Sequence, residues 1–212
     1  MKKSILFLLV SFFALTSLPA QIKLGVKVGG STTSLNASQI NLFNQGGLKE
    51  LQLALADANY GIHGGFLVQV KLGGLLIQPE FLFNSNSVDY EVTDLNTLIT
   101  QIKTEKYQYL DIPVLLGFKL GPLRLMAGPE AHVYLDNTSG LLDFDGYRQD
   151  FDELTLAWMG GVGLDLWNIM LDLRYEGNLT NFGSHINFKG NSYSFDERPS
   201  RWLFSVSFLL GK

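Results

Sequence analysis

The residues of this chain that could do chemistry are three histidines and a group of carboxylates in one long link. His63, His132 and His185 lie on different segments, and their spacing matches no metal-ligand motif. Ser184 precedes His185, so a serine nucleophile beside a base is the one catalytic pairing to weigh, with acids between residues 143 and 153. Adjacent side chains in a loop are weak support for catalysis, which needs a fixed geometry between nucleophile and base. We therefore expect no catalytic residues, no metal and no cofactor.

The link from residue 143 to residue 153 combines acidic and aromatic side chains. Its carboxylates could bind a hard cation such as calcium, but they lack the regular acidic and glycine positions of a calcium loop. A solvated acidic surface is the simpler interpretation. The aromatic residues between the acids indicate a contact surface, because exposed aromatic side chains often mark binding sites. This part of the predicted surface comprises Phe144, Tyr147 and Phe151.

His132 belongs to a stretch, residues 107–135, in which apolar and polar positions alternate on both sides of Gly121-Pro122. Period-two alternation predicts two strands joined by a tight turn, each with one apolar and one polar face. The polar face carries full charges at mid-strand, as at Asp111 and Glu130. This pattern is typical of a transmembrane β-barrel, which has lipid outside and polar residues inside.

Six further segments alternate in the same way, which predicts an all-β protein of eight strands. Tight turns at residues 73–74, at 121–122 and near 168 follow the second, fourth and sixth strands, and long links follow the first, third, fifth and seventh. Short turns at one end and long loops at the other are typical of an outer-membrane barrel. We expect an eight-stranded antiparallel up-and-down transmembrane β-barrel with strands at residues 21–31, 59–72, 75–90, 107–120, 123–135, 154–167, 169–180 and 200–210.

The polar parity of these strands predicts a charged lumen. Cations and anions balance in number, so we interpret them as a structural network of ion pairs, because unpaired buried charge is costly. An ion or proton path is the alternative, but eight strands leave an interior filled by side chains. The predicted network comprises Lys27, Lys71, Glu80, Asp111, Lys119, Arg124, Glu130, Asp165, Asp172, Arg174 and Glu176, with Lys23 on the same parity.

The chain begins with a segment of the form of a signal peptide. Lys2 and Lys3 precede an apolar run from residue 5 to residue 15, and small residues follow up to Ala20. We expect residues 1–20 to be removed near Ala20 and residues 21–212 to form the barrel. The 212-residue chain has no cysteine, so it can form no disulfide, and its net charge of −4 gives no reason to expect nucleic acid as a partner.

The motif Tyr-Leu-Asp-Ile-Pro-Val-Leu-Leu-Gly-Phe-Lys at residues 109–119 resembles the PorT-like outer-membrane β-barrel family. The segments at residues 127–130 and 161–181 share the resemblance, which covers essentially the whole mature chain. It implies a small eight-stranded barrel in the outer membrane. The founding member of that family is linked to type-nine secretion, but no residue of this sequence specifies that role.

The first two long links carry helix-forming patterns. Residues 48–58 are rich in leucine, alanine, lysine and glutamate, and Asp94 could cap a short helix over residues 95–102. Each predicted helix has an apolar stripe and would be unstable alone. We therefore expect the two to form a shared extracellular cap, whose candidate contact residues are Leu51, Leu55, Leu98 and Ile99.

From the sequence we expect a monomeric, non-enzymatic protein of the outer membrane that contacts outer-membrane lipid. Its extracellular loops are expected to serve surface binding or envelope integrity, because binding sites usually lie in loops on a rigid scaffold. A protein partner could bind at these loops. One alternative is an accessory subunit of a type-nine secretion complex or another outer-membrane complex. Another is a soluble lipocalin-like lipid carrier, because alternation alone does not distinguish the inner face from the outer face.

Overall fold

The computed structural model describes residues 21–34, 40–43, 46–58, 60–95, 97–139, 147–148, 153–180, 186–189, 191–193 and 200–210. The predicted signal peptide lies outside the described residues. No helix in the described part of the chain is long and apolar enough to cross a membrane.

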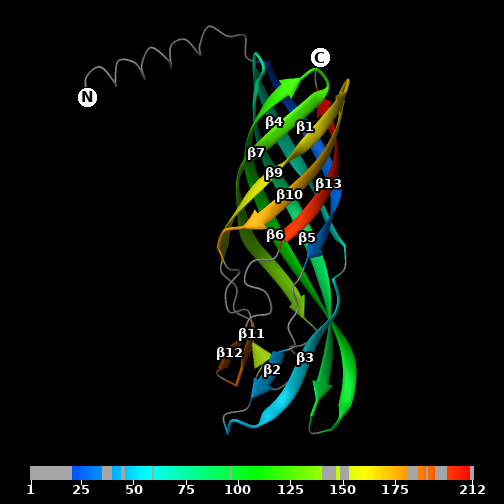
Figure 1. Ribbon diagram of the computed structural model, residues 1–212, viewed down its shortest axis with the longest axis vertical. Helices are drawn as coiled ribbons and strands as arrows, with labels where there is room; N and C mark the ends of the chain where they lie inside the picture. The colour runs from blue at the N-terminus through cyan, green and yellow to red at the C-terminus, as the bar shows by residue number, and fades with distance from the viewer. Residues whose placement is uncertain are drawn as a thin grey trace, which may run out of the picture.

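Eight antiparallel strands close into a ring, as the sequence predicts (Figure 1). Each strand pairs with its neighbours along the chain, and β1 closes the ring against β13. The ring consists of β1 (Gln21–Ser34), β4 (Gly61–Leu72), β5 (Leu75–Asp94), β6 (Ile99–Leu120), β7 (Leu123–Ser139), β9 (Leu154–Leu166), β10 (Ile169–Asn178) and β13 (Ser200–Leu210).

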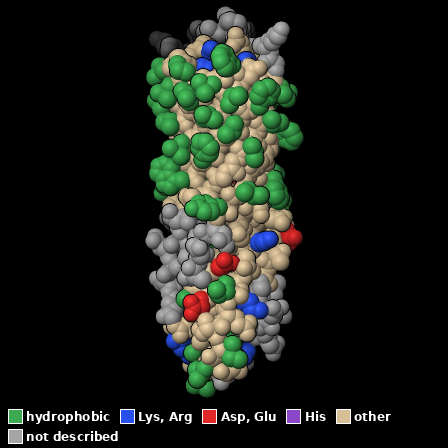
Figure 2. Space-filling model, turned by 90° about the vertical axis from the view of Figure 1, so that its right-hand side faces the viewer, with side chains coloured by type: hydrophobic (Ala, Val, Ile, Leu, Met, Phe, Trp, Pro, Cys, Tyr) green, Lys and Arg blue, Asp and Glu red, His purple; other side chains and the backbone are tan. Residues whose placement is uncertain are grey.

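The two faces of the barrel wall follow the predicted parity. On β13, Trp202, Phe204 and Val206 point outward and are exposed, whereas the intervening side chains are buried in the lumen. Figure 2 shows hydrophobic side chains spread over the barrel half of the molecule and fewer of them over the other half. The barrel therefore presents an apolar outer band and keeps its polar residues inside, as expected for a wall that faces lipid.

Three tight turns gather at one end of the barrel, which we call the turn end. Gly73 and Gly121 have φ of 63° and 62°, and Trp167 reaches φ of 57° without being a glycine. Positive φ lets a two-residue turn match the twist of its flanking strands. The start of β1 and the end of β13 lie at the same end, since Gln21 pairs with Lys71 and Leu24 with Leu210.

At the opposite end, which we call the mouth, the chain continues well beyond the barrel. β5 has 20 residues and β6 has 22, about twice the 9–11 that a strand needs to cross a bilayer. β3 (Lys49–Ala58) pairs with the outer half of β5, and β2 (Ile40–Phe43) pairs with β3. A separate small sheet contains β8 (Tyr147–Arg148), β11 (Ile186–Phe188) and β12 (Asn191–Tyr193). We call β2, β3, the small sheet and the outer halves of β5 and β6 the extension (Figure 1).

The extension has an apolar interior of its own. Apolar side chains from three of its strands and from the small sheet are at most 4% exposed: Leu42, Leu51, Leu53, Val92 and Phe188. Polar contacts join the two sheets, because Lys189 Nζ lies 2.7 Å from Glu50 Oε2. The extension is therefore a folded part of the molecule.

The predicted helical cap is wrong. Residues 49–58 form β3. Asp94 ends β5, Leu98 has φ of 58°, and β6 begins at Ile99. Leu51 and Leu53 lie two residues apart and are both buried, which is strand spacing. Pairing with β5 overrides the helix propensity of leucine and alanine, because propensity is weak beside cross-strand contacts.

We predict that Leu53→Ala loosens the extension without opening the barrel. Leu53 is 1% exposed, and truncation of a buried leucine costs about 2–5 kcal/mol. Limited proteolysis should cut residues 40–58 faster, while the heat-modifiable gel mobility of the barrel persists. The control is Leu98→Ala at a side chain 78% exposed, which should change neither measurement. Loss of heat-modifiable mobility in Leu53→Ala would show that the extension is not a separate folding unit.

Candidate functional site

The turn-side half of the lumen holds a network of ion pairs. Lys27 Nζ lies 2.7 Å from Glu80 Oε1 and 3.1 Å from Asp172 Oδ2. Arg174 donates from Nη1 to Glu80 Oε2 and from Nη2 to Glu80 Oε1, both at 2.9 Å, and from Nη2 to Asp172 at 3.0 Å. Arg124 Nη2 lies 2.8 Å from the other oxygen of Asp172. These residues come from β1, β5, β7 and β10, so the network connects strands around the ring.

The network reaches the turn end through Asp165, which pairs with both Arg124 and Lys119. Gly163 leaves the space that this arrangement needs, because a Cβ there would lie 2.7 Å from Arg124 Nη2. Each carboxylate of this half contacts at least two cations, so its buried charges are compensated, which buried ion pairs require. We call Lys27, Glu80, Lys119, Arg124, Asp165, Asp172 and Arg174 the turn-side network.

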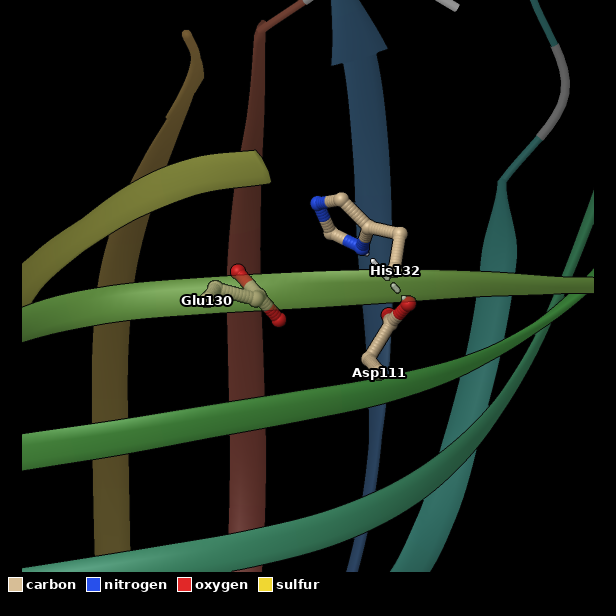
Figure 3. Close-up of side chains that lie close together, drawn as sticks. All are labelled: Asp111, Glu130 and His132. Atoms are coloured by element: carbon tan, nitrogen blue, oxygen red, sulfur yellow. Dashed lines mark hydrogen bonds and ion pairs between the residues drawn. The ribbon is translucent and has the colours of Figure 1, made fainter. Parts of the chain in front are cut away.

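A second group of charges lies nearer the mouth. Asp111 Oδ1 lies 2.7 Å from His132 Nδ1, and Asp111 Oδ2 accepts from Arg201 Nη2 at 2.8 Å and from Asn84 at 2.6 Å. Glu176 accepts from Arg201 Nε at 2.6 Å, and its other oxygen lies 3.4 Å from His132 Nε2. With Glu130, we call Asp111, His132, Glu176 and Arg201 the mouth-side cluster. Figure 3 shows Asp111, Glu130 and His132, on neighbouring strands.

Glu130 differs from the other carboxylates of the lumen. It is 1% exposed, and neither carboxylate oxygen has a hydrogen-bond partner among the residues that the structure describes. Its backbone lies opposite Pro113 of β6. A buried carboxylate without partners is costly, so Glu130 is the least satisfied side chain of the described lumen.

A buried serine–histidine contact also lies inside the barrel. His63 Nε2 is 2.8 Å from Ser205 Oγ. A serine nucleophile needs a base that a third group orients, and within the described residues His63 Nδ1 has no hydrogen-bond partner. We therefore interpret this contact as packing between two lumen side chains. The other candidate pair, Ser184 and His185, lies outside the described residues.

The structure distributes the predicted lumen residues unequally. Ten of them fall into the turn-side network or the mouth-side cluster. Lys71, which is half-buried, makes no ion pair with a described residue, and the same holds for Lys23. Arg201 belongs to the mouth-side cluster, although the predicted lumen residues did not include it. The alternation of β13 could have identified it, since Arg201 shares its parity with the lumen residues Ser205 and Ser207.

The residues predicted to form a loop contact surface lie at different places in the structure. Leu51 is buried in the extension, whereas Leu98 and Ile99 are exposed at its tip. The backbone of Leu55 lies in β3 and that of Tyr147 in β8. Phe144 and Phe151 lie outside the described residues.

A polar group beyond the apolar band connects the barrel to the extension. Glu105 is buried and accepts hydrogen bonds from Tyr107 and Ser139. Burial, together with the neighbouring Tyr90 and Glu105, raises the pKa of Tyr107 well above its ordinary value near 10. The Tyr107 hydroxyl therefore stays a neutral donor over the physiological pH range. Sequence reasoning placed residue 107 at a strand start and missed this group, because β6 begins at Ile99.

A known protein family matches most of the chain. Residues 17–184 match the family described as outer membrane protein beta-barrel domain. The crystal structure of Neisserial surface protein A (NspA) is similar with a TM-score of 0.47 and 12% identity, covering 89% of this chain and 97% of that one. The outer membrane protease OmpT from Escherichia coli is similar with a TM-score of 0.38 and 9% identity, covering 90% of this chain and 96% of that one. No curated protein matches the sequence.

We predict that Arg174→Met destabilises the barrel by about 3–5 kcal/mol, the usual cost of removing one member of a buried ion pair. The change leaves the buried carboxylates of Glu80 and Asp172 with fewer cations. Urea unfolding in detergent or liposomes, followed by tryptophan fluorescence, measures the free energy of unfolding. Lys71→Met is the matched control, because Lys71 has the lumen parity without an ion pair in the described part. Equal losses in the two variants would contradict a stabilising role of the network.

Proposed function

Because the chain belongs to the outer membrane protein beta-barrel domain family, with its apolar band in the outer membrane and its tight turns on the periplasmic side, we propose that it acts outside the cell through the extension. In this proposal the protein is a non-enzymatic surface-binding protein. The barrel anchors and orients the extension, which contacts the partner.

The observation that carries this proposal is the fold of the extension. A barrel that serves only as an anchor needs strands of membrane length, yet β5 and β6 continue far beyond the apolar band and support a buried apolar interior. Apolar side chains stand exposed at its tip, with Leu98 at 78%, Ile102 at 68% and Ile99 at 53%. Exposed apolar groups on a rigid scaffold are characteristic of binding surfaces.

The filled lumen argues against transport as the main activity. Gln78, Glu80, Asn84 and Arg124 are fully buried inside the ring. Eight-stranded barrels are narrow enough for side chains to fill. In planar bilayers we therefore expect a conductance near zero for the purified protein. A discrete channel in the unmodified protein would contradict a filled lumen.

Two alternatives to this proposal are a soluble lipid carrier and a subunit of a secretion complex. The outward apolar band and the outer-membrane family exclude the soluble lipid carrier. Membership of the PorT-like family rests on the motif at residues 109–119, most of which forms the membrane part of β6. That motif lies in the barrel wall and names no partner, so the role in a secretion complex becomes an outcome to be tested.

The test is a barrel with a shortened β5–β6 hairpin. Replacing residues 90–103 by a two-residue turn joins Asp89 to Thr104, which pair in the present register. It also removes most of the β5 segment that pairs with β3. We expect the shortened protein to insert into the membrane and keep heat-modifiable mobility. In a strain that lacks the gene for this protein, it should fail to restore the surface binding that the full-length protein restores.

A milder variant serves as the matched comparison. Changing Leu98, Ile99 and Ile102 to serine keeps the strands and removes only the apolar tip, so it should reproduce the binding defect. Restoration of all phenotypes by the shortened barrel would refute a role for the extension. Co-purification after gentle detergent extraction separates the remaining alternatives, because an accessory subunit would bring the same envelope complex with full-length and shortened protein alike.

A further inference from the structure

The mouth-side cluster combines ligand types that metal ions prefer. One donor atom each from Asp111, Glu130 and His132 lies within 4.8 Å of the others, and all three residues are buried. Strand geometry holds them together, because Asp111 is the cross-strand partner of His132 and Glu130 lies two residues before His132 on the same face of β7 (Figure 3). A closed sheet thus fixes their positions, and no loop is needed.

The contacts of Asp111 orient the imidazole of His132. Asp111 accepts hydrogen bonds from Arg201 and Asn84 on one oxygen, and its other oxygen lies 2.7 Å from His132 Nδ1. A carboxylate facing Nδ1 keeps a proton on that nitrogen. The other ring nitrogen, Nε2, faces Glu176, so a metal ion binds it by displacing its proton. A histidine held in this way by a carboxylate is the usual arrangement around a protein-bound metal ion.

Glu176 and Glu130 supply further oxygen donors. Glu176 Oε1 lies 3.4 Å from His132 Nε2, and two ligands of a tetrahedral ion with bonds of about 2.0–2.1 Å are separated by about 3.4 Å. Glu130, 1% exposed, has both carboxylate oxygens without a hydrogen-bond partner in the described part of the chain. An unsatisfied buried carboxylate beside an oriented imidazole indicates a missing cationic partner.

The charge of the cluster points the same way. With a neutral His132, the carboxylates of Asp111, Glu130 and Glu176 face the single guanidinium of Arg201. Three negative charges against one positive charge leave an excess of two among buried residues, which is costly. One divalent cation would balance the excess, as would two protons, one on Glu130 and one on His132.

We propose that the mouth-side cluster binds one divalent transition-metal ion between Glu130 and the imidazole of His132, with Asp111 as the residue that positions the imidazole and Glu176 as the carboxylate that faces Nε2. One nitrogen and carboxylate oxygens suit Zn²⁺ better than Ca²⁺, which takes oxygen ligands in larger number. Because the cluster is enclosed, the ion is taken up as the barrel closes. This site is independent of the proposed function of the extension.

The test is refolding of the full chain from urea into detergent micelles with Zn²⁺, with Ca²⁺ and with a chelator. After removal of loosely bound metal on a chelating resin, elemental analysis should find about one zinc per barrel and no stoichiometric calcium. Co²⁺ in place of Zn²⁺ should give the visible absorption of a tetrahedral site. Zinc should also raise the temperature at which the heat-modifiable form is lost.

Variants distinguish a metal from protons. Glu130→Gln and His132→Gln should each abolish stoichiometric zinc, and Asp111→Asn should weaken zinc binding about 10–100-fold, as loss of a residue that orients a ligand does. The matched control is His63→Gln, which removes the other described lumen histidine and should leave zinc binding unchanged.

Stability measurements give a readout that does not depend on metal analysis. Without metal, Glu130→Gln should be at least as stable as the unmodified protein, because it removes an unpaired buried charge. With zinc, the unmodified protein should become the more stable of the two. No retained zinc and no stabilisation by zinc in the unmodified protein would overturn the proposal and leave the cluster neutralised by protons. Equal zinc in the unmodified protein and in Glu130→Gln would overturn the assigned ligands.

Discussion

Closure of the hydrogen-bonded ring is the constraint from which the other features of this protein follow. In hydrocarbon each unpaired backbone group costs several kcal/mol, so a sheet can cross the membrane only when β1 pairs with β13 and no edge remains. Closure of so few strands makes the interior narrow, and alternation turns every second side chain into it. Charged residues that are buried on that parity cannot reach bulk water and must satisfy one another. The composition of the lumen is therefore a consequence of closure.

The two halves of the lumen meet this requirement differently. In the turn-side network the carboxylates of Glu80 and Asp165 each contact two cations, and that of Asp172 contacts three. In the mouth-side cluster Arg201 is shared by two carboxylates, and Glu130 has no described partner. The first half can be explained as a stabilising network alone. The second half needs two additional positive charges, whether from protons or from a metal ion.

Most of the barrel could be predicted from the sequence because alternation over residues 107–135 and the turns at Gly73 and Gly121 are local signals. The lumen parity followed from the same signal. Arg201 was not predicted because it stands at the start of β13, where the other polar residues of its parity are uncharged serines. The contact of Asp111 with His132 could not be predicted, because it depends on the register between β6 and β7, which the sequence does not state.

The extension shows where local reasoning fails. Residues 48–58 satisfy a helical pattern and an alternating pattern at once, and only their pairing with β5 decides between them. The two strands of the β5–β6 hairpin were predicted too short for a related reason. Beyond the membrane the outward face no longer needs to be apolar, so the alternation that marks a lipid-facing strand fades although the backbone pairing continues.

The continuity of β5 and β6 from the tight turns to the tip determines how the molecule carries mechanical load. A force applied at the tip, where β5 ends at Asp94 and β6 begins at Ile99, draws both strands in the same direction, along the barrel wall. The ladders that β5 forms with β4 and β6 forms with β7 are then loaded in shear, with many hydrogen bonds sharing the force, since these bonds lie perpendicular to the strands. Traction on the cell surface is thereby transmitted to the whole ring, and no pair of strands is peeled apart bond by bond.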